Sequence, residues 1–224
     1  MRIFYLDVTP LEDDALFRQM LKTVSEDRVG KVHSLRLRQD QNLSLGAGIL
    51  LDQGLREWGL CEKEMRYQRG ENGKPFFEND PQLHFSISHS GTMVAVAFAD
   101  REIGCDIEKI RDVSMDLAKR FFKEQEYQWL LSLNGEEQRV CFFRYWTLKE
   151  SYLKATGLGL KLPLNSFWMR LDSENITAEQ NGTKLPYSFG EIGEIPGYKL
   201  SFCIKGEMGK EAIICEKRSV KKNT

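Results

Sequence analysis

The sequence predicts an α+β fold made of two similar halves that pack closely against each other. Its 224 residues suit one large domain or two subdomains of about 100 residues each, and 41% of them are hydrophobic, which is enough for a core. Both halves mix segments of helical apolar spacing with short strand-like runs, and no long linker separates them. We therefore expect subdomains over 1–101 and 102–224, with a ligand cleft at their interface.

The first half is predicted to contain two helices and three strands. Ser25 is a suitable N-cap for a helix that runs through Lys31 toward Leu37. In the second helix apolar residues recur at helical spacing, and Gly59 is a plausible stop. The segment 70–81 is rich in Gly, Asn and Pro and is expected to be mostly loop. The second helix is expected over 41–58, and the strands over 2–8, 83–88 and 92–99, the last two joined tightly at 89–91.

The second half is expected to open with a strand over 103–109. Ser114 caps a helix that reaches about residue 133, and a further helix runs from about 136 to 155, where Gly157 stops it. Strand pairs at 83–99 and 198–215 occupy similar places in the two halves, which suggests an old duplication. The basic, polar tail 217–224 is expected to be frayed. The remaining short strands are expected over 167–171, 198–204 and 211–215.

Composition excludes several classes of protein. Lys and Arg number 32 against 33 Asp and Glu, so the strong basic excess of a nucleic-acid binder is missing. Asp7 interrupts the N-terminal apolar stretch, and the longest apolar run, 93–99, is far shorter than the ~18 residues of a membrane span. We therefore expect a cytoplasmic protein with no nucleic-acid or membrane partner. The five cysteines form no CxxC pair, which favours buried reduced thiols over a zinc or disulfide framework.

An acidic pair stands on the strand over 103–109. Side chains alternate along a strand, so Asp106 and Glu108 share one face while the apolar residues beside them share the other. Two carboxylates on one face repel each other unless a cation lies between them, and oxygen ligands suit Mg²⁺. The alternative is an ordinary solvent-exposed polar face.

A second charged pair stands on the helix over 136–155. Glu150 and Lys154 are four residues apart and point together, among Phe143, Trp146 and Leu153. A surface ion pair worth ~0.3–0.5 kcal/mol is the alternative. The aromatic neighbours favour burial instead, and a buried carboxylate needs a partner such as a metal ion.

Several basic or hydroxyl side chains could meet an anion. Lys74 follows a glycine and precedes a proline that stiffens the chain. Ser88 and His89 belong to a tight turn with free N–H groups, and Arg28 and Lys31 lie near a helix N-terminus. Taken alone, each basic residue is equally well explained as a solvated surface charge, and His89 as a structural residue. Together with a hard cation they match a multi-phosphate ligand chelated to Mg²⁺.

Five motifs stand in order along the chain: Gly73-Lys74-Pro75, the segment 84–91 (HFSISHSG), the segment 104–108 (GCDIE), Arg120-Phe121-Phe122 and the segment 146–154 (WTLKESYLK). Their order and spacing resemble the 4′-phosphopantetheinyl transferase superfamily, in its two-subdomain, Sfp-type branch. The resemblance covers essentially the whole chain, and its G-x-D-I-E and W-x-x-K-E-x-x-x-K motifs, about 40 residues apart, are specific in combination. It implies two subdomains related by a pseudo-twofold axis, with the active site between them.

The resemblance also implies roles for single residues. It places Mg²⁺ on Asp106, Glu108 and Glu150, and Lys154 near the reacting phosphate. Glu126 corresponds to a residue sometimes found in the outer metal shell. Related chains often carry a lysine at the position of Arg28 and an arginine at that of Leu43. The residues implied to contact the phosphates and adenosine of coenzyme A are Arg28, Lys31, Ser44, Lys74, Ser88, His89 and Lys154.

The implied reaction is transfer of the phosphopantetheine arm of coenzyme A to a serine of an apo carrier protein, with release of 3′,5′-adenosine diphosphate. Glu150 is mainly a metal ligand in this scheme, and it or a water that it holds accepts the serine proton. Carrier docking is expected around 119–122, unless Phe121 and Phe122 are simply core residues. A monomer is expected. A Mg²⁺-dependent hydrolase of coenzyme A-like nucleotides and a non-catalytic carrier-binding module are the alternatives. Fatty-acid, polyketide and nonribosomal-peptide carriers all stay open.

Overall fold

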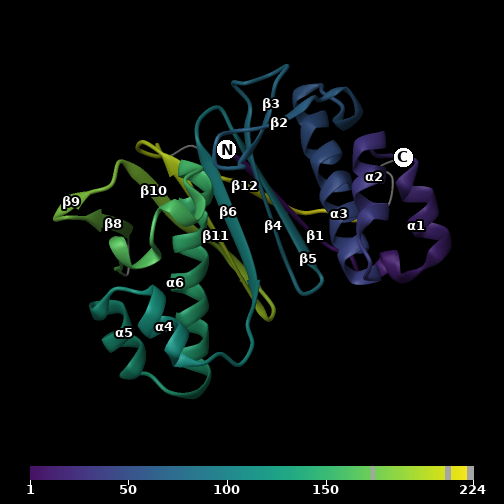
Figure 1. The fold of residues 1–224 in the computed structure, drawn as a ribbon. Helices are drawn as coiled ribbons and strands as arrows, with labels where there is room; N and C mark the ends of the chain where they lie inside the picture. Colours follow the sequence, from purple (N-terminus) through teal and green to yellow (C-terminus); the bar gives the residue numbers. More distant parts are fainter. Residues whose placement is uncertain (173–174, 210–212, 221–224) are drawn as a thin grey trace.

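The computed structural model describes residues 1–172, 175–209 and 213–220, and these form an α+β fold in layers. Figure 1 shows helices of the first half on one side, strands of two sheets in the middle and helices of the second half on the other side. The sheet of the first half has the strand order β12-β1-β5-β4, and that of the second half has the order β10-β11-β6. The expected α+β class with two packed halves agrees with this arrangement.

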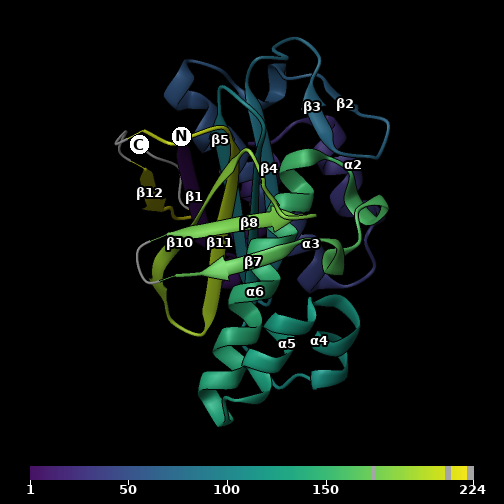
Figure 2. The same ribbon diagram turned by 90° about the vertical axis from the view of Figure 1, so that its left-hand side faces the viewer.

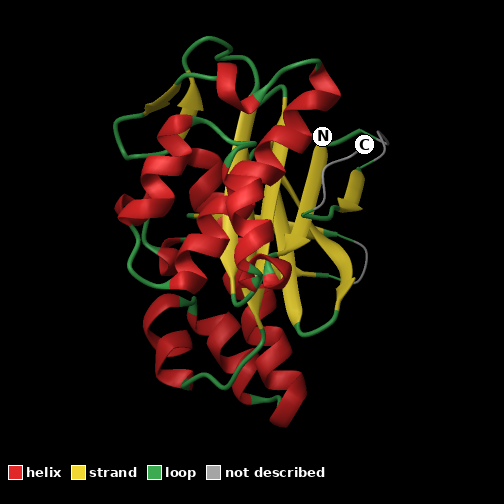
Figure 3. Cartoon of the chain, turned by 90° about the vertical axis from the view of Figure 1, so that its right-hand side faces the viewer, coloured by secondary structure: helices red, strands yellow, loops and turns green. Residues whose placement is uncertain are grey.

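The first half supplies three helices to one face of its sheet, which Figure 3 shows from the helical side. Ser25 caps the second of them, because its Oγ accepts a hydrogen bond from the Arg28 N–H at 3.3 Å. The elements are β1 (Arg2–Asp7), α1 (Asp14–Leu21), α2 (Glu26–Ser34), α3 (Arg38–Leu55), β2 (Tyr67–Arg69), β3 (Pro75–Phe77), β4 (His84–Ser90) and β5 (Met93–Ala99), with 3-10 turns η1 (Thr9–Glu12), η2 (Arg56–Trp58) and η3 (Glu62–Glu64).

The second half packs its long helix against the other sheet. Figure 2 shows the small sheet of β7 to β9 facing the viewer near that helix, with α4 and α5 below it. None of the helices in the described ranges is long and apolar enough to cross a membrane. The elements are β6 (Ile103–Lys109), α4 (Met115–Phe121), α5 (Glu124–Leu131), α6 (Gly135–Thr156), η4 (Gly159–Lys161), η5 (Leu164–Ser166), β7 (Trp168–Leu171), β8 (Ile176–Gln180), β9 (Thr183–Lys184), β10 (Tyr187–Ile195), β11 (Tyr198–Lys205) and β12 (Ile214–Lys217).

The two sheets face each other across an apolar core that both halves build. Ile103, Cys105 and Ile107 of β6 belong to this core together with Ala95 and Ala97 of β5. The opposite face of β6 is therefore left for Asp106 and Glu108, as the alternation along the strand predicts. Burial of the apolar face holds the strand in this register, because a slip by one residue would bury the carboxylates in the core.

Polar contacts join β4 to β6 beside that core. Ser86 Oγ accepts from the Cys105 N–H at 3.0 Å, and Ser90 Oγ accepts from the Lys109 N–H at 3.1 Å. Every second residue of β4 from Ser86 to Ser90 is a serine, so their hydroxyls point toward β6 along one strand face. These contacts place β4 of the first half alongside the acidic strand of the second.

Most of the expected elements are confirmed by the structure. The strand over 103–109 has the predicted bounds, and helix α6 ends at Gly157 in the left-handed conformation, with φ of 69°. Gly59, also left-handed with φ of 71°, follows η2 at the end of the predicted helix over 41–58. Glycine suits both positions because it has no Cβ to clash there.

The helix expected over 114–133 is instead two short helices. Ser114 caps α4 as predicted, but Phe122 leaves the helical conformation, with φ of −104° and ψ of 162°. Its ring then lies in the core, 5.3 Å from the ring of Phe142 and 5.8 Å from that of Tyr145. The gain from burying an aromatic ring explains the break, which neither Gly nor Pro marks in the sequence.

The tight turn is also shifted from its expected place. His89 and Ser90 belong to β4, and the chain turns at Gly91, whose φ is 59°. In the segment expected to be mostly loop, β3 pairs with β2. The helix α1 and the strands β8 and β10 were not expected from the sequence. Helix α1 did offer a local signal, because Asp13 caps it and its buried residues Phe17 and Met20 are three positions apart.

The strand pair expected at 198–215 is wrong. β11 pairs with β10 and β6, whereas β12 pairs in parallel with β1 of the first sheet. Residues 211–212 of the expected strand lie outside the described residues. The tail expected to fray from 217 stays ordered to 220, because Arg218 binds Glu57 at 2.7 Å and Val220 is buried. Residues 221–224 lie outside the described ranges.

Candidate active site

Asp106 is the buried centre of the acidic cluster. It is 5% exposed, and its Oδ1 accepts hydrogen bonds from Ser88 Oγ and from Lys154 Nζ, each at 2.7 Å. Its Oδ2 is buried and has no hydrogen-bond partner within the described part of the chain. Burial raises the pKa of Asp106, although the charge of Lys154 opposes this. Such an orphaned acceptor is suited to a cation or to a donor from a ligand.

Glu108 lies two residues further along β6, on the same strand face. Its Oε2 accepts from Ser90 Oγ at 2.6 Å and from Arg111 Nη1 at 3.0 Å. The negative charge of Glu108 contributes to the raised pKa of Asp106. The two carboxylates are therefore close enough to repel each other, as their spacing on the strand predicts.

Glu150 approaches this pair from α6. Burial raises its pKa, the charge of Asp106 raises it further, and Glu108 adds to the effect, while Lys154 opposes it. Two carboxylates of β6 therefore act electrostatically on a third that α6 contributes from a distant part of the sequence. Helix α6 brings Glu150 and Lys154 to the same side because they are one turn apart.

The carboxylates of this cluster are chemically suited to a divalent cation, but their side chains would have to move closer together to coordinate it. As the side chains stand, no three His, Cys, Asp or Glu residues within 1–172, 175–209 and 213–220 are grouped to hold a metal ion. Lys154 occupies one oxygen of Asp106, and Arg111 binds Glu108. Two features suit Mg²⁺. The Oδ2 of Asp106 is an oxygen without a partner in the described part of the chain, and the negative carboxylates repel one another unless a cation lies among them.

Close contact between β6 and α6 positions Lys154. A Cβ on Gly104 would fall on the carbonyl oxygen of Ser151 and lie 2.5 Å from the Ala155 nitrogen, so only glycine lets the strand lie on the helix. Burial lowers the pKa of the Lys154 ammonium, but the charge of Asp106, its hydrogen bond and the charges of Cys105 and Glu150 together raise it overall. Lys154 is thus held as a cation against the acidic strand.

A cavity of about 330 Å³ opens beside the charged cluster. Both halves line it, because the 72–75 loop and β4 face the last turns of α6. A second cavity of about 210 Å³ shares Pro75, Phe85 and Ile87 with it and extends toward α2. The first cavity is lined by Asn72, Gly73, Lys74, Pro75, Phe85, Ser86, Ile87, Glu150, Leu153, Lys154, Gly157 and Gly159.

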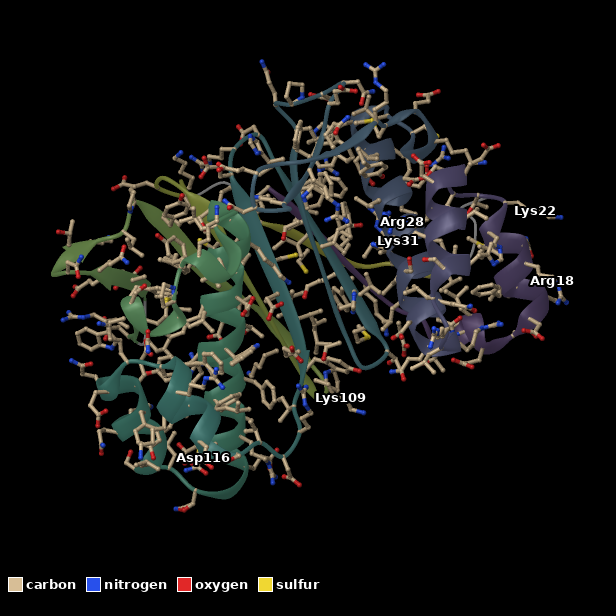
Figure 4. All side chains as sticks on the ribbon, viewed as in Figure 1. Arg18, Lys22, Arg28, Lys31, Lys109 and Asp116 are labelled. Carbon is tan, nitrogen blue, oxygen red and sulfur yellow. The ribbon has the colours of Figure 1, made fainter. Side chains whose placement is uncertain are left out.

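Basic side chains gather at the second cavity. Figure 4 shows Arg28 and Lys31 close together on α2, whereas Arg18 on α1 and Lys22 just after it lie farther out. Partial burial lowers the pKa of Lys31, and the charges of Arg28 and Arg69 lower it further. Three cations held this close favour an anion among them.

His89 lies between the basic group and the acidic cluster. Partial burial lowers its pKa first, and the charges of Lys154 and Lys31 lower it further, while Asp40 and Asp106 oppose them. The imidazole is therefore neutral at neutral pH in the free protein. Of the residues predicted to meet an anion, Arg28, Lys31, His89 and Lys154 are thus brought into one electrostatic neighbourhood.

Two other predicted coenzyme contacts, Lys74 and Ser88, bind groups of the protein itself, and a third, Ser44, has no partner among the described residues. Lys74 Nζ donates to the backbone oxygens of Ile103 at 3.1 Å and Ala155 at 2.8 Å. Ser88 donates to Asp106. Ser44 on α3 is buried, and its Oγ has no hydrogen-bond partner within the described ranges.

Glu126 is engaged away from the acidic cluster. It is fully buried and binds Lys149 Nζ at 2.9 Å, and it accepts from the N–H groups of Met169 at 2.7 Å and Lys123 at 2.8 Å. An outer-shell metal role does not follow from these contacts. Lys149 also donates to the carbonyl oxygens of Leu164 and Phe167, which ties α6 to the segment before β7.

Family models match both halves of the chain. Residues 9–101 match the N-terminal domain of 4′-phosphopantetheinyl transferase, and residues 102–203 match the 4′-phosphopantetheinyl transferase superfamily. The chain belongs to the 4′-phosphopantetheinyl transferase superfamily. The resemblance found in the sequence motifs is therefore confirmed.

Curated members of the superfamily are similar over most of the chain. The 4′-phosphopantetheinyl transferase Sfp of Bacillus subtilis is 35% identical over 207 residues, which cover 91% of this chain and 92% of that protein. The 4′-phosphopantetheinyl transferase gsp of Aneurinibacillus migulanus is 39% identical over 64% of this chain and 60% of its own. The transferase HetI of a Nostoc species is 33% identical over 67% of each chain.

In this phosphopantetheinyl transferase, sequence reasoning missed two charged residues near the site. Arg69 joins Arg28 and Lys31, but it stands on a short strand in a segment without a clear period. Lys149 belongs to the W-x-x-K-E-x-x-x-K motif, yet its ammonium is fully buried and points away from the cavity lining. The sequence did indicate that Lys149 points away from the site. Adjacent residues of a helix point in different directions, so Lys149 cannot lie on the same helix face as Glu150.

Proposed function

We propose that this chain transfers the 4′-phosphopantetheine arm of coenzyme A to a serine of an apo carrier protein, with Mg²⁺ as the cofactor and 3′,5′-adenosine diphosphate as the second product. The observation that carries the proposal is the meeting of Lys154 and Glu150 from α6 with Asp106 from β6 at a cavity that both halves line. Membership of the superfamily gives the reaction class.

The basic group supports binding of the nucleotide end of coenzyme A. Arg28, Lys31 and Arg69 offer positive charge at the second cavity, and His89 lies between them and Lys154. The two cavities share lining residues, so one extended ligand could reach from the basic group to the acidic cluster. We therefore assign the phosphates to this path and the arm to the less polar first cavity.

Asp106, Glu108 and Glu150 would hold Mg²⁺. When bound there, the ion would neutralise negative charge on the diphosphate as the bond between its phosphates breaks. The orphaned Oδ2 of Asp106 supports this assignment, because it is a buried acceptor without a donor in the described part of the chain. Burial and the neighbouring carboxylates raise the pKa values of Asp106 and Glu150, so a cation among them would be favourable.

The remaining chemistry belongs to the carrier serine and to two side chains of this protein. The serine oxygen forms a bond to the β-phosphorus of coenzyme A, and the bond from that phosphorus to the bridging oxygen breaks, so that 3′,5′-adenosine diphosphate leaves. Lys154 is placed to stabilise the charge that grows on the phosphate oxygens. Glu150 is mainly a metal ligand in this scheme, and it or a water that it holds accepts the serine proton.

A transfer assay tests the proposal. The protein is incubated with coenzyme A, Mg²⁺ and an apo carrier protein, and the carrier is weighed by mass spectrometry. A gain in mass equal to the arm is expected. Free nucleotide without a mass gain would instead indicate a hydrolase, and an unchanged carrier with unchanged coenzyme A would indicate a binding module.

Other expectations stay predictions alongside this function. The subdomain boundary between 101 and 102, the monomeric state and a cytoplasmic location are among them. Docking of the carrier around 119–122 would rely on Lys119, Arg120 and the half-buried Phe121, since Phe122 is a core residue.

A further inference from the structure

Lys74 connects the two halves of the molecule at the end of helix α6. It stands on the loop before β3 in the first half, and its Nζ donates to the carbonyl oxygens of Ile103 on β6 and Ala155 on α6. Both acceptors belong to the second half. Ala155 lies in the last turn of α6, where carbonyl groups have no partner within the helix.

A cation at this position is a cap for the helix. The carbonyl oxygens at a helix C-terminus carry partial negative charge, so a positive group among them is favourable. Within α6 the Gly157 N–H already bonds to the Leu153 oxygen, and Lys74 satisfies the neighbouring Ala155 oxygen from outside. The turn that Lys74 holds also carries Lys154, and Glu150 lies one turn earlier.

The glycine at the helix end makes room for the lysine. A Cβ on Gly157 would lie 3.2 Å from Cδ of Lys74, so the aliphatic stem passes directly over this residue. Gly104, next to the acceptor Ile103, lets β6 lie against the same turn. Three segments from two halves therefore meet at one ammonium group.

We propose that Lys74 is a positioning residue: its ammonium caps α6 across the interface of the two halves and so fixes the last turns of the helix, with Glu150 and Lys154, against β6. This role differs from a direct contact with the phosphates of coenzyme A, which the sequence motif suggested. The kinetic part of the inference rests on the proposed transferase function, whereas the capping itself does not.

Two variants and a matched control separate the two roles. Lys74→Met keeps the stem and removes the ammonium, and Lys74→Arg keeps the charge. Lys63→Met is the control, because Lys63 Nζ also donates to a backbone oxygen, that of Lys22 at 2.8 Å, but on the exposed surface. The measurements are hydrogen exchange of the Gly157 amide in the free protein, the Kd for coenzyme A, and kcat for transfer.

The capping role predicts a specific pattern of change. In Lys74→Met the Gly157 amide is expected to exchange roughly tenfold faster, and kcat to fall by roughly tenfold, as for the loss of one charge-assisted hydrogen bond. The Kd for coenzyme A should change less than about threefold. Lys74→Arg should recover part of kcat, and Lys63→Met should change nothing. If wild-type protein shows no transfer, the exchange result still tests the cap.

The proposal is overturned if Lys74→Met weakens coenzyme A binding tenfold or more while exchange at Gly157 stays at the wild-type rate. It is equally overturned if the variant behaves like Lys63→Met. Should Lys74→Met fail to fold, titration of the Lys74 Nζ by NMR in the wild-type protein decides. A cap predicts the same titration with and without coenzyme A, whereas a phosphate contact would raise the lysine pKa by about one unit or more.

Discussion

The ammonium of Lys154 lies 2.7 Å from Oδ1 of Asp106 and joins helix α6 to strand β6 at the cavity between the two halves. This ion pair leaves the second oxygen of Asp106 buried and without a partner in the described part of the chain. The pair thus holds the acidic strand in place while leaving one strong acceptor for a ligand.

Asp106→Asn should abolish most of the transfer activity. The substitution keeps the shape of the side chain but removes the charge that Lys154 faces and the oxygen assigned to Mg²⁺. Loss of one such interaction in a phosphoryl transfer is worth several kcal/mol of barrier, so the rate should fall about 100-fold or more. The measurement is the initial rate of carrier modification, followed by mass spectrometry in saturating Mg²⁺.

Asp112→Asn is the matched control for this substitution. Asp112 also pairs with a cation, Arg139 at 2.9 Å, but its side chain is 94% exposed. Its rate should stay within about twofold of wild type, because exposed ion pairs contribute little. A near-normal rate for Asp106→Asn, with native circular dichroism, would show that Asp106 is not essential.

Mg²⁺ should stabilise the fold more at neutral than at acidic pH. The pKa of Glu150 is raised in the folded protein by burial and by Asp106. The folded state therefore holds a proton that the unfolded state has released, and stability from this group falls as pH rises from about 4.5 through the raised pKa. A cation bound by the ionised carboxylates offsets that loss of stability. At a concentration 100 times its Kd, it would add about 2.7 kcal/mol to the free energy of unfolding.

Thermal unfolding with and without Mg²⁺ checks this expectation. The Tm should rise with Mg²⁺ at about pH 7.5 and rise much less at about pH 5, where carboxylates bind protons instead. Glu150→Gln should reduce both the Mg²⁺ effect and the pH dependence. An equal Tm shift at the two pH values, or one that survives in Glu150→Gln, would contradict a Mg²⁺ site at this cluster.

Lys149→Met should destabilise the fold far more than an ordinary surface change. Lys149 and Glu126 are both fully buried and lie 2.9 Å apart, so removing the lysine leaves a buried carboxylate without its partner. Breaking one partner of a buried ion pair costs about 3–5 kcal/mol. Urea unfolding followed by circular dichroism measures the loss.

The double variant Lys149→Met with Glu126→Gln separates charge from packing. A neutral amide can still accept from the N–H of Met169 or Lys123, so a substantial part of the lost stability should return. Glu124→Gln, at an exposed position on the same helix as Glu126, should have little effect. If the double variant were as unstable as Lys149→Met, the ion pair would not be the cause.

Gly104→Ala should destabilise the protein, and Gly30→Ala should not. A Cβ at position 104 would collide with the backbone of α6, which can move only with the whole helix, so a loss of about 1–3 kcal/mol is expected. On α2, a Cβ at position 30 meets nothing within 4 Å, and alanine there should stabilise the helix by about 0.5–1 kcal/mol. The urea midpoint of Gly104→Ala should be lower than that of the wild type, and that of Gly30→Ala should be higher. Equal shifts of the two midpoints would contradict the prediction.

Parts of the fold with strong local signals were predictable. The strand over 103–109 alternates apolar and charged residues, and it has the predicted bounds. Gly157 stops α6 where only glycine adopts the left-handed conformation freely. By contrast, the helix over 114–133 looked continuous, because the break at Phe122 depends on the rings that it meets in the core.

The candidate site was predictable in its residues and less so in their partners. The carboxylates of Asp106 and Glu150 were expected to lie close together, and the charge of Asp106 does raise the pKa of Glu150. Lys74 was expected to face an anion, but it binds two carbonyl groups of the other half. Its contacts depend on where α6 ends relative to β6, which no local pattern records.

Residue types and their periods can be read along the chain: they tell which strand face carries the carboxylates, which helix turn carries Glu150 and Lys154, and which superfamily the motifs indicate. The pairings could be known only once the elements were packed, among them Lys154 with Asp106, Lys149 with Glu126, and β12 with β1. Periodicity reflects burial of one face of an element, whereas pairing depends on the distances between elements, which packing sets.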